Sequence, residues 1–172
     1  MFTSGSCTGF PAPFIVSCGT SDLSFRQRLV KPGRFNWGHP ISSKPDVFGA
    51  FVKKILLELK AQPALAANTA VFVTFDEGGG YYDSGYIQPL DFFGDGPRIP
   101  LIVVSAYSQG GRVVHAYADQ VSILKFIEKN WNLPTISGRS RDNLPNPVAT
   151  AADPYVPTNP PAIDDLMDFF QF

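Results

Sequence analysis

Apolar residues recur at two different spacings along the chain, and these spacings predict its regular elements. Between residues 47 and 59 they return every three or four positions, with lysines and a glutamate elsewhere, which is the pattern of an amphipathic helix. Ser43 or Asp46 is expected to cap this helix, with Pro45 near its first turn. Pro63 is expected to stop it. This apolar stripe indicates core packing and carries no chemistry.

A second helix is expected after residue 118. Asp119 or Ser122 would start it, and Pro134 would end it. Its apolar face would consist of Val121, Leu124, Ile127 and Trp131. Near the end of the chain, residues 162–172 alternate apolar and acidic side chains over a turn or two, so this segment is expected to dock onto the domain.

Two continuous apolar runs predict strands rather than helices. Residues 70–75 and 101–104 are rich in β-branched and aromatic side chains and are bounded by turn signals, which is typical of strands buried on both faces. Ligands of parallel α/β sheets sit where the strands end. We therefore expect both runs to end at one sheet edge. Residues 112–114 are expected to be a short strand or extended segment that leads to His115.

The first strand ends in the most distinctive stretch of the chain, in which Asp76 and Glu77 are followed by three glycines. Glycines leave such a strand end uncrowded and permit backbone angles that other residues resist. Two adjacent carboxylates there suit a cation that binds through oxygen, and the element order would bring Ser105, His115 and Asp119 to the same edge. A metal held there could assist phosphate-ester hydrolysis. A surface turn with two solvated acids is an equally open interpretation.

Composition excludes several classes of protein. The 172 residues suffice for one domain with a sizeable core, and the net charge of −1 gives no support to nucleic-acid binding. No apolar run approaches the roughly 18 residues of a membrane-spanning helix. Cys7 and Cys18 could form a disulfide or remain thiols. We divide the chain into an irregular segment (1–38), an α/β core (39–134) and a Pro/Asn-rich tail with a short helix (135–172).

Four ordered segments together resemble a known family. They are Thr-Ala-Val-Phe-Val-Thr-Phe-Asp-Glu-Gly-Gly-Gly-Tyr-Tyr-Asp (69–83), Gly-Pro-Arg-Ile-Pro-Leu-Ile-Val-Val-Ser (96–105), Gly-Gly-Arg-Val-Val-His (110–115) and Asp-Gln-Val-Ser-Ile-Leu-Lys-Phe-Ile-Glu-Lys-Asn-Trp (119–131). They are similar to the C-terminal part of bacterial phosphoesterases, the group with phosphatidylcholine-type phospholipases C and respiratory-burst-inhibiting acid phosphatases. The resemblance extends from about His39 to Pro147.

The resemblance implies an alkaline-phosphatase-like three-layer α/β/α sandwich, present here as an incomplete C-terminal portion. It implies a hydrolase of phosphoric esters that uses a divalent metal ion bound by Asp76 and Glu77. His39 and His115 would be catalytic, and Asp119 and Gln120 would contact the phosphate-ester or phospholipid substrate. A periplasmic or secreted location would follow, although the sequence shows no signal peptide. Unpaired sheet edges would favour self-association.

The chain also departs from this family. Gly38 precedes the His-Pro pair where an acid is usual, and Gln120 stands where a histidine is usual. No Glu-Asn pair, which the family uses for its metal, occurs in the sequence. No nucleophile can be assigned, and we expect this chain alone to be weakly active or inactive. The alternative is an inactive remnant that serves as a binding or scaffold domain. A glycosidase is a weaker alternative, because that reaction needs two carboxylates on opposite sides of the glycosidic bond, whereas Asp76 and Glu77 are neighbours in the chain.

Overall fold

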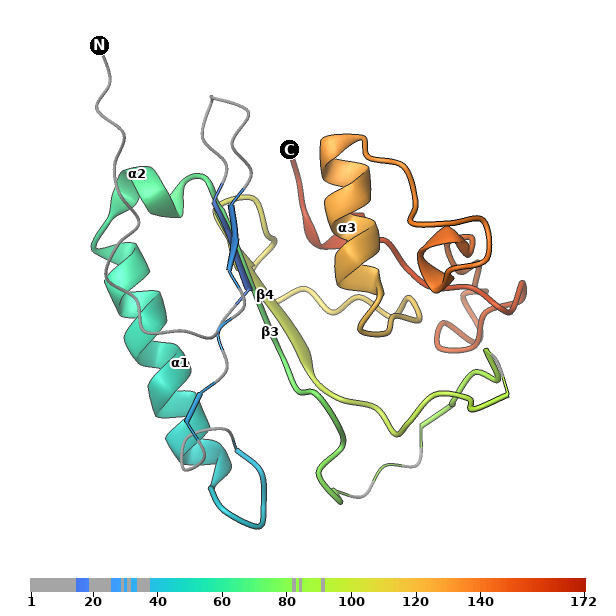
Figure 1. Cartoon of the computed structure of the whole chain (residues 1–172), viewed down its shortest axis with the longest axis horizontal. Coiled ribbons are helices and arrows are strands. Elements are labelled where there is room, and N and C mark those ends of the chain that lie inside the picture. The colour runs from blue at the N-terminus through green and yellow to red at the C-terminus, as the bar shows by residue number, and fades with distance from the viewer. Residues whose placement is uncertain are drawn as a thin grey trace. The chain divides into compact units, whose positions relative to one another are not determined.

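The computed structural model describes the protein at residues 15–18, 26–28, 30, 32–33, 38–81, 83, 85–90 and 92–172. The chain forms two compact units that interleave in sequence (Figure 1). The first contains residues 1–74 and 101–106, and the second contains residues 75–100 and 107–172. The three-segment division by composition stays a prediction, and Cys7 of the possible disulfide lies outside the described residues.

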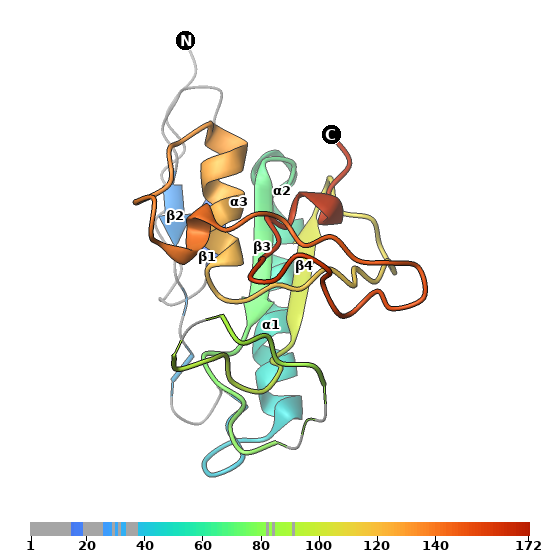
Figure 2. The same ribbon diagram turned by 90° about the vertical axis from the view of Figure 1, so that its right-hand side faces the viewer.

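The first unit is a mixed α/β structure built on a four-stranded sheet (Figure 2). Its strands are β1 (Ile15–Cys18), β2 (Arg26–Arg28), β3 (Thr69–Thr74) and β4 (Leu101–Ser105). They lie in the order β2-β1-β3-β4, and every neighbouring pair is antiparallel. The described strands are therefore antiparallel throughout, whereas the sequence suggested a parallel sheet.

The antiparallel pairing of β3 and β4 corrects the expectation that both strands end at one sheet edge. Thr74 at the end of β3 lies opposite Leu101 at the start of β4, and Ala70 lies opposite Ser105. Ser105 is thus at the far end of the strand pair from the residues that follow β3. An apolar run shows that a strand is buried but carries no information on its direction relative to a neighbour, which is why the expectation failed.

Burial also distinguishes the two predicted strands. Val71, Phe72 and Val73 of β3 are each at most 5% exposed, which confirms a strand with buried residues on both faces. β4 is the last strand in the sheet, and Ile102 is 56% exposed, so the expectation of a second fully buried strand is wrong. An apolar run on an edge strand looks the same in sequence as one in the centre.

One helix covers a face of this sheet (Figure 1). α1 (Pro45–Lys60) confirms the predicted helix, and a short α2 (Pro63–Ala66) follows it, so Pro63 opens a new helix after ending the first. The residue before α1 is Lys44, and no side chain caps the helix, contrary to the expected capping by Ser43 or Asp46. The core comprises Leu59, Val71 and Val73, packed with Phe48, Val52, Leu56, Leu65, Ala66 and Val104.

The second unit is organised around α3 (Ser122–Trp131), which confirms the second predicted helix. Its most buried apolar side chains are Ile123, Phe126 and Ile127. Of the predicted apolar face, Ile127 is buried, and Val121, Leu124 and Trp131 are only half-buried. Lys125 and Glu128 are also buried, and such burial is invisible to a hydrophobic periodicity. Asn132 ends the helix in a left-handed conformation with φ 51°. Residues 112–114 form no strand.

The tail of the chain packs in the second unit. Two short 3-10 turns, Arg141–Asn143 and Met167–Phe169, interrupt otherwise irregular backbone. Ile163 and Leu166 have no exposed surface, and the Phe170 ring stacks on Phe126 of α3 at 4.8 Å between centroids. Docking of the final segment is thus confirmed. Within the described ranges, no helix combines the length and the apolar character needed to cross a membrane.

Candidate functional site

The chain leaves β3 through a tight turn that carries the two adjacent carboxylates. Asp76 and Glu77 are both exposed. The amide of Tyr81 donates to the carbonyl of Gly78 at 3.0 Å and closes the turn. Gly79 and Gly80 have φ values of 61° and 82°, which side-chain-bearing residues rarely adopt. The glycine run therefore permits the backbone conformation that follows the acids.

Gln120 holds this turn from a distant part of the sequence. Its side-chain nitrogen Nε2 donates to the carbonyl oxygens of Asp76, at 2.7 Å, and Phe75, at 3.3 Å. These two carbonyls belong to the peptide groups on either side of the Asp76 α-carbon. The side chain of Gln120 thereby reaches the backbone that positions the first carboxylate.

Asp119 fixes the segment that contains Gln120. Its Oδ1 accepts hydrogen bonds from the amides of Val121, at 2.8 Å, and Ser122, at 3.2 Å. In return, the Ser122 hydroxyl oxygen accepts from the Asp119 amide at 3.2 Å. The aspartate thus accepts hydrogen bonds from amides at the start of α3, but of the two residues expected to start the helix it is Ser122 at which α3 begins.

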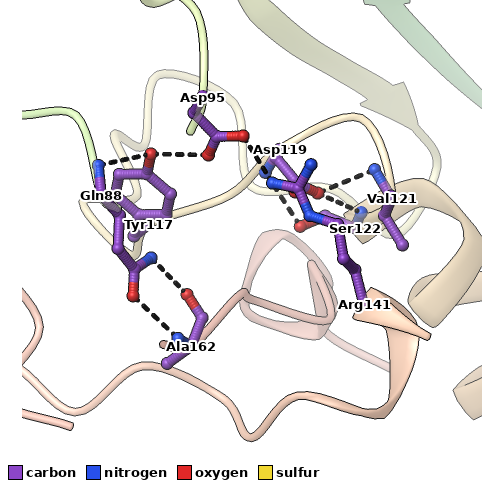
Figure 3. Close-up of polar contacts among 8 residues, drawn as sticks. All are labelled: Gln88, Asp95, Tyr117, Asp119, Val121, Ser122, Arg141 and Ala162. Atoms are coloured by element: carbon purple, nitrogen blue, oxygen red, sulfur yellow. Dashed lines mark hydrogen bonds and ion pairs between the residues drawn. The ribbon is translucent and has the colours of Figure 1, made fainter. Parts of the chain in front are cut away.

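Arg141 links this helix start to the loop that follows β3 (Figure 3). Its Nη2 lies 2.7 Å from Asp119 Oδ2 and 2.5 Å from Asp95 Oδ1. The side chains of these two aspartates are only 10% and 14% exposed, and that of the arginine is 33% exposed. One guanidinium therefore compensates two largely buried carboxylates from different segments.

Tyr117 extends the same network (Figure 3). Its hydroxyl donates to Asp95 Oδ2 at 2.8 Å and accepts from the amide of Gln88 at 3.0 Å. The fully buried Gln88 side chain in turn exchanges two hydrogen bonds, of 2.7 and 2.8 Å, with the backbone of Ala162. The loop after β3, the start of α3 and the tail are thus joined by side chains within one unit.

Burial controls the protonation of this network. It raises the pKa of Asp119, although the charge of Arg141 opposes the rise. Burial, with the hydrogen bond to Asp95, raises the pKa of the Tyr117 hydroxyl to about 12. Tyr117 is therefore protonated at neutral pH and serves as a hydrogen-bond donor, which makes it unsuitable as a general base there.

A second ion pair shapes the same loop. Arg98 contacts Asp83 at 2.6 Å, and its side chain also hydrogen-bonds both carboxylate oxygens. These hydrogen bonds hold the pKa of Asp83 well below its usual range. A Cβ on Gly85 would lie 2.0 Å from Arg98 Nε, so the glycine leaves room for the pair. The ion pair thus ties together two positions of the loop that are 15 residues apart.

The two histidines of the sequence lie in different units. His39 is in the first unit, where its Nδ1 accepts a hydrogen bond of 3.2 Å from the amide of Ile41. His115 is in the second unit, exposed, with its ring edge-on to Tyr155 at 4.7 Å. Their catalytic roles stay predictions.

Carboxylates of the site are of the chemical type that can bind a metal ion. Among the residues that the structure describes, no group of three or more His, Cys, Asp or Glu side chains is arranged to hold an ion. Asp76 and Glu77 offer two carboxylates, and an oxygen-ligated divalent cation takes more ligands than these can supply. The residues described here therefore do not make a complete metal site, and the divalent ion stays a prediction.

The structure brings Asp76, Glu77, Asp119 and Gln120 close together within the second unit, and the metal and substrate roles expected of them stay predictions. Three further residues of this network were not singled out from the sequence. Arg141, Asp95 and Tyr117 join the site through contacts between residues 22 to 46 positions apart. Arg141 stands in a Pro/Asn-rich stretch without any periodic pattern. A single arginine in such a tail gives no signal, and only the tertiary structure reveals its role.

The sequence of the chain matches a model of one protein family. Residues 28–134, more than half of the chain, match the model of the phosphoesterase family. The chain belongs to this family. The match includes Asp119, Gln120 and the turn of residues 76–81 after β3, which we call the acidic turn. It confirms the resemblance inferred from the four sequence segments.

Curated relatives are named phospholipases C. The chain is 31% identical over 155 residues to a "Non-hemolytic phospholipase C" of Burkholderia pseudomallei, an alignment that covers 68% of this chain and 22% of the relative. It is 30% identical over 184 residues to "Phospholipase C A" of Mycobacterium tuberculosis. That alignment covers 90% of this chain and 34% of the relative. The chain thus spans between about a fifth and a third of these relatives' lengths.

Proposed function

We propose that this chain carries one part of the active site of a metal-dependent phosphoric-ester hydrolase of the phospholipase C or acid phosphatase type. The observation that carries the proposal is the Asp76-Glu77 turn, which lies inside the family match and is held by Gln120. Two exposed carboxylates at a constrained backbone position suit a hard or borderline cation. The remaining ligands and the nucleophile would come from outside the residues described.

The proposal extends to fold and surroundings. The mixed α/β unit, with α1 on one face of the sheet, is compatible with one face of a three-layer sandwich of alkaline-phosphatase-like type. The edge strand β4 with exposed Ile102 supports pairing with further strands or self-association. The names of the relatives support a phosphate ester or phospholipid as substrate, and with it a periplasmic or secreted location.

A titration calorimetry experiment tests the site. The purified chain, free of metal, is titrated with Mn²⁺, Zn²⁺ and Ca²⁺ beside an Asp76→Ala/Glu77→Ala variant. We expect saturable binding of at least one ion to the parent chain and its loss in the double variant. An Asp46→Ala/Glu58→Ala variant, which loses two acids from α1, should bind as the parent does. Binding that survives in the Asp76/Glu77 variant would refute the site.

An activity assay addresses the absence of an assigned nucleophile. We expect the chain alone to turn over a chromogenic phosphate ester weakly or not at all. Turnover by the purified chain that is lost on Asp76→Asn would show instead that the chain holds its own nucleophile.

A non-catalytic binding or scaffold domain is the second candidate function. Two observations favour it, namely the absence of a Glu-Asn pair from the sequence and the use of the Gln120 amide for backbone contacts. Glutamine cannot exchange a proton near neutral pH, unlike histidine. Absence of metal binding in both the parent chain and the double variant would support this function.

A further inference from the structure

The side chain of Gln120 donates hydrogen bonds to two backbone carbonyls at the start of the acidic turn. The amide nitrogen of Gln120 carries two hydrogens. The carbonyl oxygens of Phe75 and Asp76 lie 3.3 and 2.7 Å from this nitrogen. A neutral imidazole has one donor hydrogen in all, so a histidine could not serve both carbonyls in the same way.

The two carbonyls are significant because of where they lie. One belongs to the peptide group before the Asp76 α-carbon and the other to the peptide group after it. A donor that binds both restricts rotation on both sides of this α-carbon. The direction of the Asp76 carboxylate, and of Glu77 immediately after it, depends on these rotations.

The backbone on either side of Gln120 is fixed by contacts of its neighbour Asp119. Asp119 accepts from the amides of Val121 and Ser122, and it is also paired with Arg141 at 2.7 Å. Arg141 in turn contacts Asp95, which lies on the loop that begins with the acidic turn. The backbone on which Gln120 stands is therefore anchored to that loop by a second, separate connection.

We propose that Gln120 is a positioning residue that sets the direction of the Asp76 and Glu77 carboxylates through the backbone on both sides of Asp76. Asp119 and Arg141 support it by fixing the segment on which it stands. This use of the amide nitrogen differs from the substrate contact expected from sequence. The inference rests on the proposed role of the Asp76-Glu77 pair, and its first test is chosen so that the result does not depend on metal binding.

The test is native-state hydrogen exchange, measured by mass spectrometry on peptides that cover residues 75–81. Gln120→Glu keeps the shape of the side chain but replaces the donor with an acceptor that faces two carbonyl oxygens. Loss of two neutral hydrogen bonds to the backbone should let the turn open more often, so we expect the amide of Tyr81, which donates to the Gly78 carbonyl, to exchange about tenfold faster. Peptides from α3 and from residues 135–172 should exchange as in the parent. Gln120→Ala provides the same test if the glutamate variant does not fold.

Two matched variants complete the design. Gln120→Lys retains donor hydrogens and should keep most of the protection of residues 75–81. Gln171→Glu makes the same charge change at another exposed glutamine of this unit and should leave exchange unchanged. The inference is overturned if residues 75–81 exchange normally in Gln120→Glu, if the lysine variant loses protection equally, or if α3 peptides accelerate to the same extent.

A metal titration separates this inference from the proposed function. If the parent chain binds Mn²⁺, Gln120→Ala should weaken binding about tenfold, because the carboxylates lose their fixed direction. Unchanged affinity would refute the positioning role. If the parent chain does not bind Mn²⁺, Zn²⁺ or Ca²⁺, the proposed metal site fails, and the exchange experiment alone decides whether Gln120 fixes the turn.

Discussion

At the scale of single residues, Gly78 of the turn after β3 is expected to be hard to replace because it lies against Pro97. A Cβ added there would lie 2.8 Å from Cγ of Pro97, and a proline ring cannot move aside without its backbone. We therefore expect Gly78→Ala to lower the free energy of unfolding by about 1–3 kcal/mol, the usual cost of overpacking. Urea unfolding, followed by the fluorescence of Trp131 in a Trp37→Phe background, measures it.

Gly96→Ala is the matched control for this prediction. It makes the same substitution in the same loop, where a Cβ would meet no atom within 4 Å. Alanine also has lower conformational entropy than glycine in the unfolded chain, so this variant should be unchanged or slightly more stable. Equal stability of the Gly78 and Gly96 variants would show that the loop yields freely near Pro97.

Residues of the site differ in how far sequence could predict them. Asp76 and Glu77 were recognisable because a strand signal, two acids and three glycines are adjacent in the chain. Asp119 and Ser122 were both recognisable as residues near a helix start because they precede an amphipathic pattern, and α3 begins at Ser122. Arg141 was not recognisable, since its two ion pairs join residues 22 and 46 positions away. Information of that kind exists only in the folded chain.

At the scale of elements, a buried lysine adds hydrogen bonds between α3 and the tail to the stacking of Phe126 on Phe170. Nζ of Lys125 donates to the carbonyls of Leu144, at 2.8 Å, and Ile163, at 2.7 Å, and to Oδ1 of Asn146 at 2.8 Å. Burial lowers the pKa of this lysine. We expect Lys125→Met to reduce the free energy of unfolding by roughly 2–3 kcal/mol, because buried acceptors lose their donor.

Because Lys125 donates to carbonyls of the tail, its loss should also make the tail easier to cleave. Limited proteolysis should cut residues 135–172 faster in Lys125→Met than in the parent chain. Lys129→Met, four residues along the same helix and exposed, should change neither stability nor cleavage appreciably. Similar behaviour of the two methionine variants would contradict the role of Lys125.

Sequence patterns predicted the elements better than their pairing. α1, α3, β3 and β4 were all expected near their observed positions, because each has a continuous or periodic apolar pattern. The antiparallel pairing of β3 and β4 and the exposure of Ile102 were not expected, since both depend on neighbours in the sheet. The buried face of α3 was mistaken because it includes Lys125 and Glu128, whose polarity conceals their burial.

At the scale of the whole molecule, buried carboxylates make stability depend on pH. Burial raises the pKa of Asp164 to about 6, from 3.8, and the nearby Asp165 and Asp168 add to the rise. Burial likewise raises the pKa of Asp119 and Glu128. A folded state that binds protons more tightly than the unfolded state gains stability as pH falls through the raised pKa.

Other carboxylates act in the opposite direction at lower pH. The pKa of Asp83 is held down by its hydrogen bonds with Arg98. Burial would raise the pKa of Asp142, but hydrogen bonds from Ser140 and the Ile136 amide lower it on balance. These groups stabilise the fold above their ordinary pKa and lose that contribution as pH falls below it. The free energy of unfolding should therefore be greatest between about pH 4 and 6.

Asp164→Asn tests how much the raised pKa of Asp164 lowers the free energy of unfolding between pH 6 and pH 7. Asp164 is 5% exposed, and its Oδ2 accepts from the amide of Leu166 at 3.0 Å, a bond that an asparagine oxygen can also accept. The shift from 3.8 to about 6 corresponds to at most about 3 kcal/mol. We expect the variant to be more stable than the parent at pH 7 and nearly equal at pH 4, whereas Asp153→Asn, at an exposed site, should follow the parent throughout. Parallel stability curves for the parent and Asp164→Asn would show that Asp164 does not hold its proton more tightly in the folded state.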